Sequence, residues 1–497
     1  MADEATAGSW AAKAQSITLP QQMIIDGSPA RTSSEETANI TSPRDGKIIT
    51  TVPKGHPDDV DRAVAAARRA FTDSSWAGLR PPERKMLLHR FADAIEAHRD
   101  ELALLISLEM GKPIEYAYSI EMRTTIACYR WYAEWVDKLS GEVPEVGAEA
   151  LALVTREPIG VVGVVVPWNF PMTLSAWKIA PALAVGCTVV IRPSDLSPLS
   201  ALRLAELGLQ AGLPDGVLNV VTGQGRQTAQ RLGLHPDVDT LAFTGSTEVG
   251  RAYLRYAADS NLKRVWLELG GKSPSIVLPD ADIDAAVAGT AGNIFFNQGE
   301  MCTAPSRLLV HRSIRDEVVD GVVRHAESLR IGDPLDPATQ MGPLVSASHR
   351  EKVEAHTQGA VDAGAVLRTG GDRPDVGLDG FYLRPTVLDR VEPGMAIGRE
   401  EVFGPVLSVL TFEDEDQAVA MANDTEYGLA AAVWTRDVSA AHRVSRKVQA
   451  GTVWVNCYEE GDMTVPFGGF KQSGNGRDKS VHALEKYTEL KTTWIVL

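Results

Sequence analysis

The sequence predicts an α/β protein with an open, doubly wound α/β domain followed by a second α/β domain. From residue 160 onward, short β-branched apolar runs alternate with amphipathic segments of helix length, and a second alternation of this kind begins at residue 274. Strands that are apolar on both faces are typical of parallel sheets covered by helices on each side. A length of 497 residues is enough for two or three such domains.

The first alternation follows a helical N-terminal region. Apolar spacing predicts helices over 58–71, 82–108 and 115–138, and Gly111 and Pro113 are a reasonable end for the second. The expected strands that come next are residues 161–166, 188–193, 217–221, 240–243 and 264–269. In such a sheet a ligand is expected at the carboxyl ends of the strands.

The second alternation is expected to form another sheet with its own helices. The expected strands are residues 274–279, 307–311, 405–411, 429–435 and 451–455. The expected helices are residues 282–296, 313–329, 414–423 and 439–449. The terminal run 489–497 is strand-like and apolar, so it is expected to pair with something, such as another subunit.

Composition and charge exclude several classes of protein. A net charge of −16 argues against nucleic acid or an anionic membrane as the main partner. The longest apolar run, residues 161–166, is far shorter than the roughly 20 residues of a membrane span. The N-terminus lacks a secretory pattern, and the four cysteines show neither a CxxC pair nor metal-ligand spacing. We therefore expect a reduced, cytoplasmic protein with no metal site.

A nucleotide-binding turn is suggested by "FTGSTEVG" at 243–250. Gly245 permits close backbone approach, and Ser246 or Thr247 can cap a following helix whose N-terminus offers N–H groups to a pyrophosphate. A tightly capped strand–helix turn without a ligand explains the same residues. The usual GxGxxG is missing, because "TGQGRQT" has Thr228 in the third glycine position.

Three further turns carry candidate chemistry. Asn169 lies between Pro167 and Pro171 after the first strand, where its amide can donate to an oxyanion or satisfy local backbone. Glu268 ends a strand between two leucines, where burial would raise its pKa toward that of a general base; alternatively it is a rim charge. Cys302 follows an apolar helix, and a lone cysteine is more often a small buried residue than a nucleophile. Together, however, the thiol, carboxylate and amide form a complete set for acyl transfer.

The chain resembles the aldehyde dehydrogenase superfamily. The motifs "PWNFP", "FTGST", "LELGGKSP", "FFNQGEMCTAPSRLLV", "EEVFGPV" and "PFGGFKQSGNGRD" occur in that order, and the similarity runs from about residue 20 to the end. The resemblance implies Cys302 as nucleophile, Glu268 as general base and Asn169 as oxyanion donor. It also implies a proton-relay pair of Lys178 and Asp478, where the family more often has Glu at the second position.

The resemblance further implies a Rossmann-like NAD-binding domain. Glu401 would hold the nicotinamide ribose, and the family's "KPSE" reads "RPSD" at 192–195 in this chain. An acidic Asp195 favours NAD over NADP by repelling a 2′-phosphate, while Arg192 could soften that preference. The full set of expected cofactor contacts is Val166, Trp168, Arg192, Ser194, Asp195, Gly225, Phe243, Gly245, Ser246, Val249, Leu269, Glu401 and Phe403.

For the substrate, the segment from Cys457 to Trp494 is similar to bacterial dehydrogenases of polyamine catabolism. These act on γ-glutamyl-γ-aminobutyraldehyde or 4-guanidinobutyraldehyde, so carboxylates near the mouth would attract a cationic group above an apolar throat. The expected substrate contacts are Glu121, Phe170, Leu174, Trp177, Met301, Thr303, Glu459, Asp462 and Phe467. The acids are equally explained as solvated surface charges.

The resemblance gives boundaries and partners as well. Residues 1–139 and 160–270 would form the NAD-binding domain, 271–470 the catalytic domain, and 140–159 with 471–497 a small β oligomerisation element. Within that element, residues 140–158 and 487–497 would pair between chains in a homodimer or a homotetramer. Two alternatives stay open, a broad-specificity aliphatic or aromatic aldehyde dehydrogenase and a cysteine esterase or acyltransferase without a redox cofactor.

Overall fold

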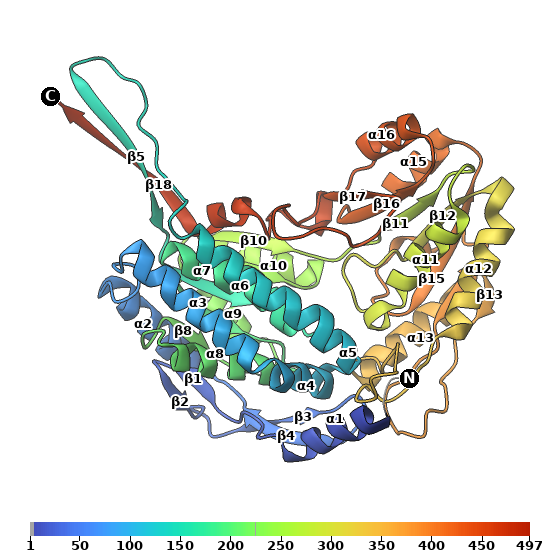
Figure 1. Ribbon diagram of the computed structural model, residues 1–497, viewed down its shortest axis with the longest axis horizontal. Helices are drawn as coiled ribbons and strands as arrows, with labels where there is room; N and C mark the ends of the chain where they lie inside the picture. Colours follow the sequence, from blue (N-terminus) through green and yellow to red (C-terminus); the bar gives the residue numbers. More distant parts are fainter. Residues whose placement is uncertain (1–3, 224) are drawn as a thin grey trace.

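The protein folds as two α/β lobes and a projecting two-stranded arm, as shown by a computed structural model that describes residues 4–223 and 225–497 (Figure 1). The first lobe holds a seven-stranded sheet in the order β10-β9-β6-β7-β8-β1-β2. Its strands are β10 (Arg264–Glu268), β9 (Thr240–Thr244), β6 (Val161–Val165), β7 (Thr188–Arg192), β8 (Leu218–Val220), β1 (Met23–Ile25) and β2 (Ser28–Ala30). The five strands from β10 to β8 run parallel, and the hairpin β1–β2 adds antiparallel to β8.

Alternation along the strands divides the first lobe into two cores. In β6, Val161 and Val165 face one helical layer, while Val162 and Val164 face the other. The first layer is α2 (Pro57–Thr72), α9 (Gln227–Leu234) and α10 (Thr247–Ala258). The second is α3 (Pro81–Ala97), α4 (Arg99–Met110), α6 (Arg123–Trp135), α7 (Pro171–Val185) and α8 (Leu199–Ala211). Burial of both faces explains why these strands read as continuous apolar runs.

The second lobe repeats this design with the order β13-β14-β15-β12-β11-β16-β17. Its strands are β13 (Val366–Thr369), β14 (Thr386–Asp389), β15 (Val406–Phe412), β12 (Arg307–His311), β11 (Pro274–Val277), β16 (Ala430–Trp434) and β17 (Thr452–Val455). Helices α11 (Ile283–Ile294) and α12 (Arg315–Ser328) cover one face. The other face is covered by α13 (Ala347–Asp362), α14 (Ala396–Arg399), α15 (Glu415–Asn423) and α16 (Val438–Lys447).

The remaining elements surround these lobes. They are α1 (Glu4–Ser16), the hairpin β3 (Thr37–Thr41) with β4 (Ile48–Pro53), and the short helix α5 (Ile114–Tyr116). Short 3₁₀-helical segments cover Phe296–Gly299, Arg312–Ile314, Lys471–Ser473 and Val481–Tyr487. Within the described residues, no helix combines the length and apolar character that a membrane span needs.

Two expected helices differ from the structure. The helix expected over 82–108 is interrupted at His98, whose φ of −107° and ψ of 23° are not helical, so the chain forms α3 and α4 instead. The expected helix 115–138 contains a π-helical turn over Ala117–Met122 before α6. Apolar spacing continues through both places, so the sequence pattern does not reveal the change in backbone.

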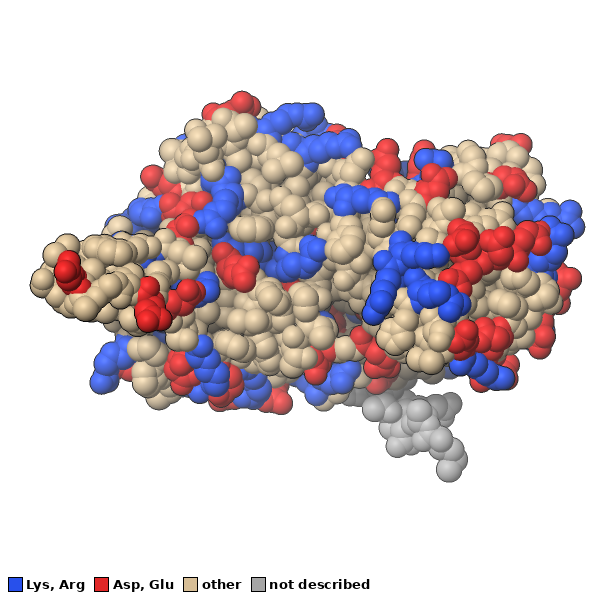
Figure 2. All heavy atoms as spheres, turned by 90° about the horizontal axis from the view of Figure 1, so that it is seen from above, with Lys and Arg blue, Asp and Glu red and all other residues tan. Residues whose placement is uncertain are grey.

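The arm consists of β5 (Ala150–Pro158) and β18 (Thr488–Val496), paired antiparallel with each other along their whole length. These two segments, which were expected to pair between chains, pair with each other within one chain, and their pairing with a second chain stays a prediction. The arm projects from the body with the C-terminus at its tip (Figure 1), and most of its surface in Figure 2 is neither acidic nor basic. Trp494, Ile495 and Val496 are exposed there. The domain boundaries stay a prediction.

Candidate active site

Three cavities meet between the lobes, and Cys302 lies where two of them join. The cleft, of about 380 Å³, is bordered by Glu268, Glu401 and Phe403. The tunnel, of about 260 Å³, is bordered by Trp177, Phe296 and Phe467. Cys302, Asn169 and Leu174 line both. The groove, of about 310 Å³, continues from the cleft along α10 and shares Gly245 and Ser246 with it.

A turn of buried polar residues positions Cys302. Asn297 and Gln298 have φ of 49° and 59°, in the left-handed region, and both are fully buried. The Asn297 amide donates to the carbonyl oxygens of Glu300 (3.1 Å) and Asn169 (3.2 Å). Strained backbone persists only where its surroundings hold it, and such positions cluster at functional sites. These contacts therefore fix the path of the chain into Cys302.

The glycine pair after β10 lets the two lobes approach each other at Cys302. A Cβ added to Gly271 would lie 2.4 Å from the Cys302 carbonyl oxygen, a distance at which backbone must move. The Gly271 N–H donates to a carboxylate oxygen of Glu401 at 2.9 Å. The sequence "LGG" is thus required by close approach at the site.

We expect Gly271→Ala to lower kcat by at least about tenfold, because the added methyl group displaces the Cys302 loop and misplaced reacting atoms are costly. Gly359→Ala in α13 is the matched control, since a Cβ there meets no atom within 4 Å and alanine favours a helix. The measurements are steady-state kinetics and thermal melting. Equal activity of both variants would contradict the close-approach argument.

Glu268 and Cys302 share the cleft in protonation states set by burial. The Glu268 side chain is 4% exposed, and neither carboxylate oxygen has a hydrogen-bond partner within the described part of the chain. Burial raises the pKa of Glu268 to about 8, and the positive charge of Lys178 opposes that rise. Burial, followed by the charge of Glu268, raises the pKa of the Cys302 thiol well above its usual value. Glu268 is therefore suited to take up a proton near neutral pH.

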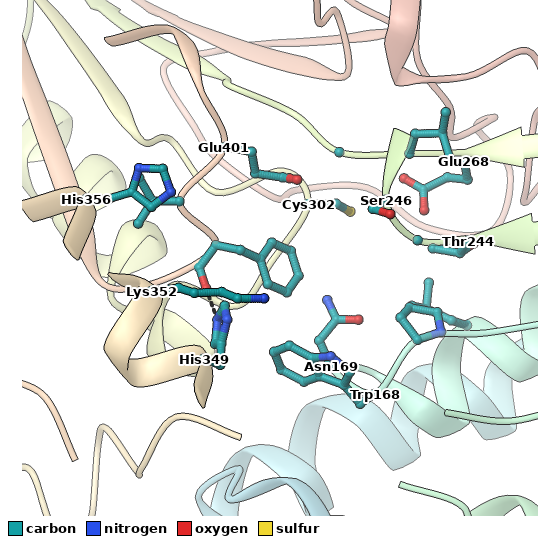
Figure 3. Close-up of a pocket in the computed structure, with 17 residues that line it drawn as sticks. Trp168, Asn169, Thr244, Ser246, Glu268, Cys302, His349, Lys352, His356 and Glu401 are labelled. Atoms are coloured by element: carbon teal, nitrogen blue, oxygen red, sulfur yellow. Dashed lines mark hydrogen bonds between the residues drawn. The ribbon is translucent and has the colours of Figure 1, made fainter. Parts of the chain in front are cut away.

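The Asn169 amide completes this group. Asn169 Nδ2 donates one hydrogen bond, to the carbonyl of Glu300 at 2.9 Å, and an amide group has a second N–H to donate. Figure 3 shows the Asn169 amide, the Cys302 thiol and the Glu268 carboxylate directed into one space from separate elements. The three predicted catalytic side chains are thus brought together.

Behind Glu268 lies a buried ionic cluster. Lys178 Nζ lies 2.9 Å from one oxygen of Asp478, and Lys486 donates to the other oxygen. Burial opposes ionisation of Asp478, but the two ammonium groups hold its pKa below its usual value. The structure thus places the predicted pair of Lys178 and Asp478 in direct contact, with a third member that sequence reasoning missed.

All of the expected cofactor-contacting residues line the groove or the cleft. The groove is lined by Val166, Arg192, Ser194, Asp195, Gly225, Phe243, Gly245, Ser246 and Val249. The cleft adds Trp168, Leu269, Glu401 and Phe403. The Trp168 ring lies edge-on to the rings of Phe403 and His349, with centroids 5.5 Å apart in each pair.

The groove and the cleft fit a dinucleotide. Ser246 caps α10 through Val249 N–H, and the other N–H groups of a helix's first turn remain for an anion. Glu401 uses one oxygen for Gly271, and burial raises its pKa to about 7. The Arg192 Nε is buried and has no hydrogen-bond partner within the described residues. One continuous cavity therefore offers the N-terminus of α10 to an anion, the carboxylate of Glu401 to a hydroxyl group, and Arg192 Nε as a further hydrogen-bond donor.

Arg192 and Asp195 are tied to each other. Arg192 pairs with one Asp195 oxygen and donates to the Gly225 carbonyl at 3.1 Å, and Gly225 N–H donates to the other Asp195 oxygen at 2.9 Å. Burial raises the pKa of Asp195, with Arg192 opposing. Arg192 is thus partly neutralised by the acid beside it, which limits its attraction for a phosphate.

The tunnel holds most of the expected substrate contacts. It is lined by Glu121, Phe170, Leu174, Trp177, Met301, Thr303, Glu459 and Phe467. Trp177 and Phe467 stack at a tilt with centroids 5.0 Å apart. The apolar throat predicted from the sequence therefore has its aromatic residues in place.

Two of the expected carboxylates are corrected by the structure. Glu121 borders the tunnel, but it is fully buried, pairs with Lys112, and accepts N–H groups from Met172 (2.9 Å) and Thr173 (3.3 Å) at the start of α7. Its charge is neutralised, so it serves as a helix cap and offers none to a substrate. Asp462 lies outside the tunnel and binds the backbone and hydroxyl of Thr464.

Several lining residues were missed by sequence reasoning. His349, Lys352 and His356 face the cleft from α13, a helix that the sequence analysis did not predict. They are three and seven residues apart, a spacing that places side chains on one face of a helix, and this spacing is the sequence feature from which their shared direction could have been predicted. The sequence also shows the polar run "NQGE" directly before Met301, and the residues of this run position the Cys302 thiol.

Comparisons with known proteins agree with this geometry. The model of the aldehyde dehydrogenase family matches residues 30–493. The Escherichia coli protein described as NADP/NAD-dependent aldehyde dehydrogenase PuuC is 48% identical over 98% of both chains. A γ-glutamyl-γ-aminobutyraldehyde dehydrogenase from Burkholderia cenocepacia is 53% identical, with a TM-score of 0.97 over 99% of this chain and 100% of that chain.

A third relative was solved with ligands. The P. syringae indole-3-acetaldehyde dehydrogenase AldA, as a C302A mutant in complex with NAD⁺ and IAA, is 48% identical, with a TM-score of 0.98 over 99% of this chain and 100% of that chain. The family match covers most of the chain, and the relatives match at nearly full length. The chain therefore belongs to the aldehyde dehydrogenase family.

Proposed function

We propose that this enzyme oxidises an aldehyde to its carboxylate with NAD through a thioester on Cys302. The observation that carries the proposal is the position of the Cys302 thiol, which lies where an apolar tunnel meets a dinucleotide-shaped cleft. Asn169 and Glu268 share its space from two other elements. A nucleophile, an oxyanion donor and a base in one cavity are what acyl transfer requires.

Each side chain has a separate task. The Cys302 thiol, which is partly exposed, releases its proton to solvent, and the thiolate attacks the carbonyl carbon of an aldehyde in the tunnel. The second N–H of Asn169 together with the Cys302 N–H stabilises the oxyanion. NAD, when bound in the groove and the cleft, supplies the acceptor for the hydride that leaves this carbon. Glu268 then removes a proton from water, and the resulting hydroxide releases the acid from the cysteine.

NAD is supported over NADP by the charge around Asp195. The N-terminus of α10 would hold the pyrophosphate, Asp195 the adenine ribose and Glu401 the nicotinamide ribose. Asp195 would repel a 2′-phosphate, and its pairing with Arg192 weakens the opposite influence of that guanidinium. Four thiols free of disulfides support the proposal of a cytoplasmic enzyme.

For the substrate we propose a γ-glutamylamino-, amino- or guanidino-butyraldehyde of polyamine catabolism, and the first of these fits best. Glu459 borders the tunnel and is exposed to solvent. Lys479 lies over Trp177 with its ammonium group 5.9 Å from the ring centroid. An acid and a base beside an apolar tunnel match the ammonium and carboxylate of a glutamyl head group. The similarity to the B. cenocepacia enzyme supports the same choice.

An aldehyde panel with two charge variants tests the substrate class. We expect Glu459→Gln to lower kcat/KM for an aminoaldehyde by about 3- to 10-fold and Lys479→Met to act only on the γ-glutamyl substrate, since a partly solvated ion pair has modest strength. Butanal is the uncharged comparison, and Glu460→Gln is the matched control because Glu460 is exposed outside the tunnel. Equal effects on butanal and the charged aldehydes would favour the broad-specificity alternative.

Two further proposals concern the alternative chemistry and the assembly. A cysteine esterase or acyltransferase without a redox cofactor would leave the groove unused, and NADH absorbance in the same panel separates it from a dehydrogenase. We also propose a homodimer or a homotetramer in which the exposed apolar side chains of the arm contact a second chain. Light scattering of the full chain measures that state.

A further inference from the structure

Lys486 is a fully enclosed charged residue to which the reaction above assigns no role. It lies in the helical turn Val481–Tyr487, and its side chain is 4% exposed. It donates to the Asp478 oxygen that Lys178 leaves free. Removing an ammonium group from water is energetically costly, and a paired carboxylate offsets that cost, so this lysine needs Asp478.

Three elements converge on Asp478. Its backbone pairs with Phe467 through hydrogen bonds of 2.7 and 2.8 Å, which fixes the position of its Cα. Its short side chain is then held from both sides, by Lys178 on α7 and by Lys486. Without Lys486, one carboxylate oxygen would be buried without a partner and free to turn away from Lys178.

The charges of the cluster do not balance without Glu268. Two ammonium groups and one carboxylate leave one net positive charge in a buried space, and an ionised Glu268 neutralises it. Lys178, Asp478, Lys486 and the Cys302 thiol are the titratable groups that act on Glu268. The other titratable groups that act on Asp478 are Cys128, Tyr132 and Tyr487, which burial keeps neutral by raising the pKa of each.

We propose that Lys486 is a positioning residue that holds Asp478 against Lys178 and supplies the positive charge that favours the ionised, active form of Glu268. This inference rests on the proposed role of Glu268 as the base for thioester hydrolysis. Lys486 acts through Asp478 and touches neither the substrate nor the reacting atoms. Its loss therefore changes the pH at which the enzyme works and leaves the binding of NAD unchanged.

The test is the pH profile of thioester hydrolysis in Lys486→Met, measured as the steady rate after the first turnover. We expect the acidic limb to move up by about one pH unit, which is about tenfold slower hydrolysis below the midpoint. Lys486→Arg, which keeps the charge, is expected to restore most of the profile. Lys491→Met is the matched control, because Lys491 lies in β18 and pairs with Glu157 in the exposed arm.

A double variant tests the sign of the charge effect. In Asp478→Asn with Lys486→Met, the ammonium group of Lys178 has no carboxylate to neutralise it, so the cluster again carries one positive charge. The acidic limb of the pH profile is therefore expected to return toward its position in the wild type. Lys486→Gln replaces Lys486→Met if the methionine variant does not fold. An unchanged limb in folded Lys486→Met or Lys486→Gln overturns the inference about Lys486. Wild-type turnover in Glu268→Gln would instead overturn the proposed role of Glu268, so the two failures are distinguishable.

Discussion

Replacing Cys302 with alanine is expected to abolish aldehyde oxidation, with kcat falling by at least about 10⁴-fold. The thiol is the nucleophile at the boundary of the tunnel and the cleft, and alanine removes the atom that would carry the acyl group. The Cys302 side chain is small and partly exposed, so its loss leaves little cavity and the fold is expected to stay intact. The measurement is NADH formation over a range of aldehyde concentrations.

Binding must be measured beside activity, because a collapsed site would give the same result. Titration of NAD by protein fluorescence is expected to give the wild-type dissociation constant, since the cofactor contacts proposed above lie on other residues. Cys457→Ala is the matched control, a second partly exposed cysteine that the tunnel does not include. Retained oxidation in Cys302→Ala would overturn the assignment of the nucleophile.

The strands were the most predictable part of the fold. The run 161–166 is buried on both faces, is apolar throughout and corresponds to β6, and the run 307–311 has an apolar centre, Leu308 to Val310, and corresponds to β12. The hairpin β1–β2 and the helix α13 were missed, because three-residue strands and a largely polar helix carry little periodic signal. The partner of β18 was unpredictable in a different way, since an apolar edge strand pairs equally well within a chain and between chains.

In the active site, too, the residues could be predicted from short stretches of sequence, whereas the charges of these residues depend on the fold. The sequence predicted that Cys302, Glu268 and Asn169 come together, because each lies in a short motif that can be recognised locally and the order of the motifs resembles one family. Which carboxylates keep a free charge could not be predicted, since that depends on partners brought by folding. Glu121 is neutralised by Lys112, and Asp478 is shared with Lys486, whereas Glu268 is left unpaired. Motifs thus identify candidate residues, and packing decides their charge.

That unpaired state makes Glu268→Gln the second variant with a large expected effect. We expect steady turnover to fall by about 10²- to 10⁴-fold, because glutamine cannot take a proton from water and the thioester accumulates. Acylation is expected to survive, since the substitution removes the negative charge that helps to raise the pKa of the Cys302 thiol. Rapid mixing with aldehyde and NAD should therefore give about one NADH per subunit, followed by a slow phase.

The pH profile separates this explanation from general damage to the site. Burial raises the pKa of Glu268 to about 8, so the ionised base is the minor form below that pH. Wild-type hydrolysis should therefore rise as the pH increases toward 8, level off above it, and fall by about tenfold for each pH unit below it. Glu268→Gln should lose this limb, because no group then titrates at that position. A variant that keeps both the limb and wild-type turnover would show that another group activates the water.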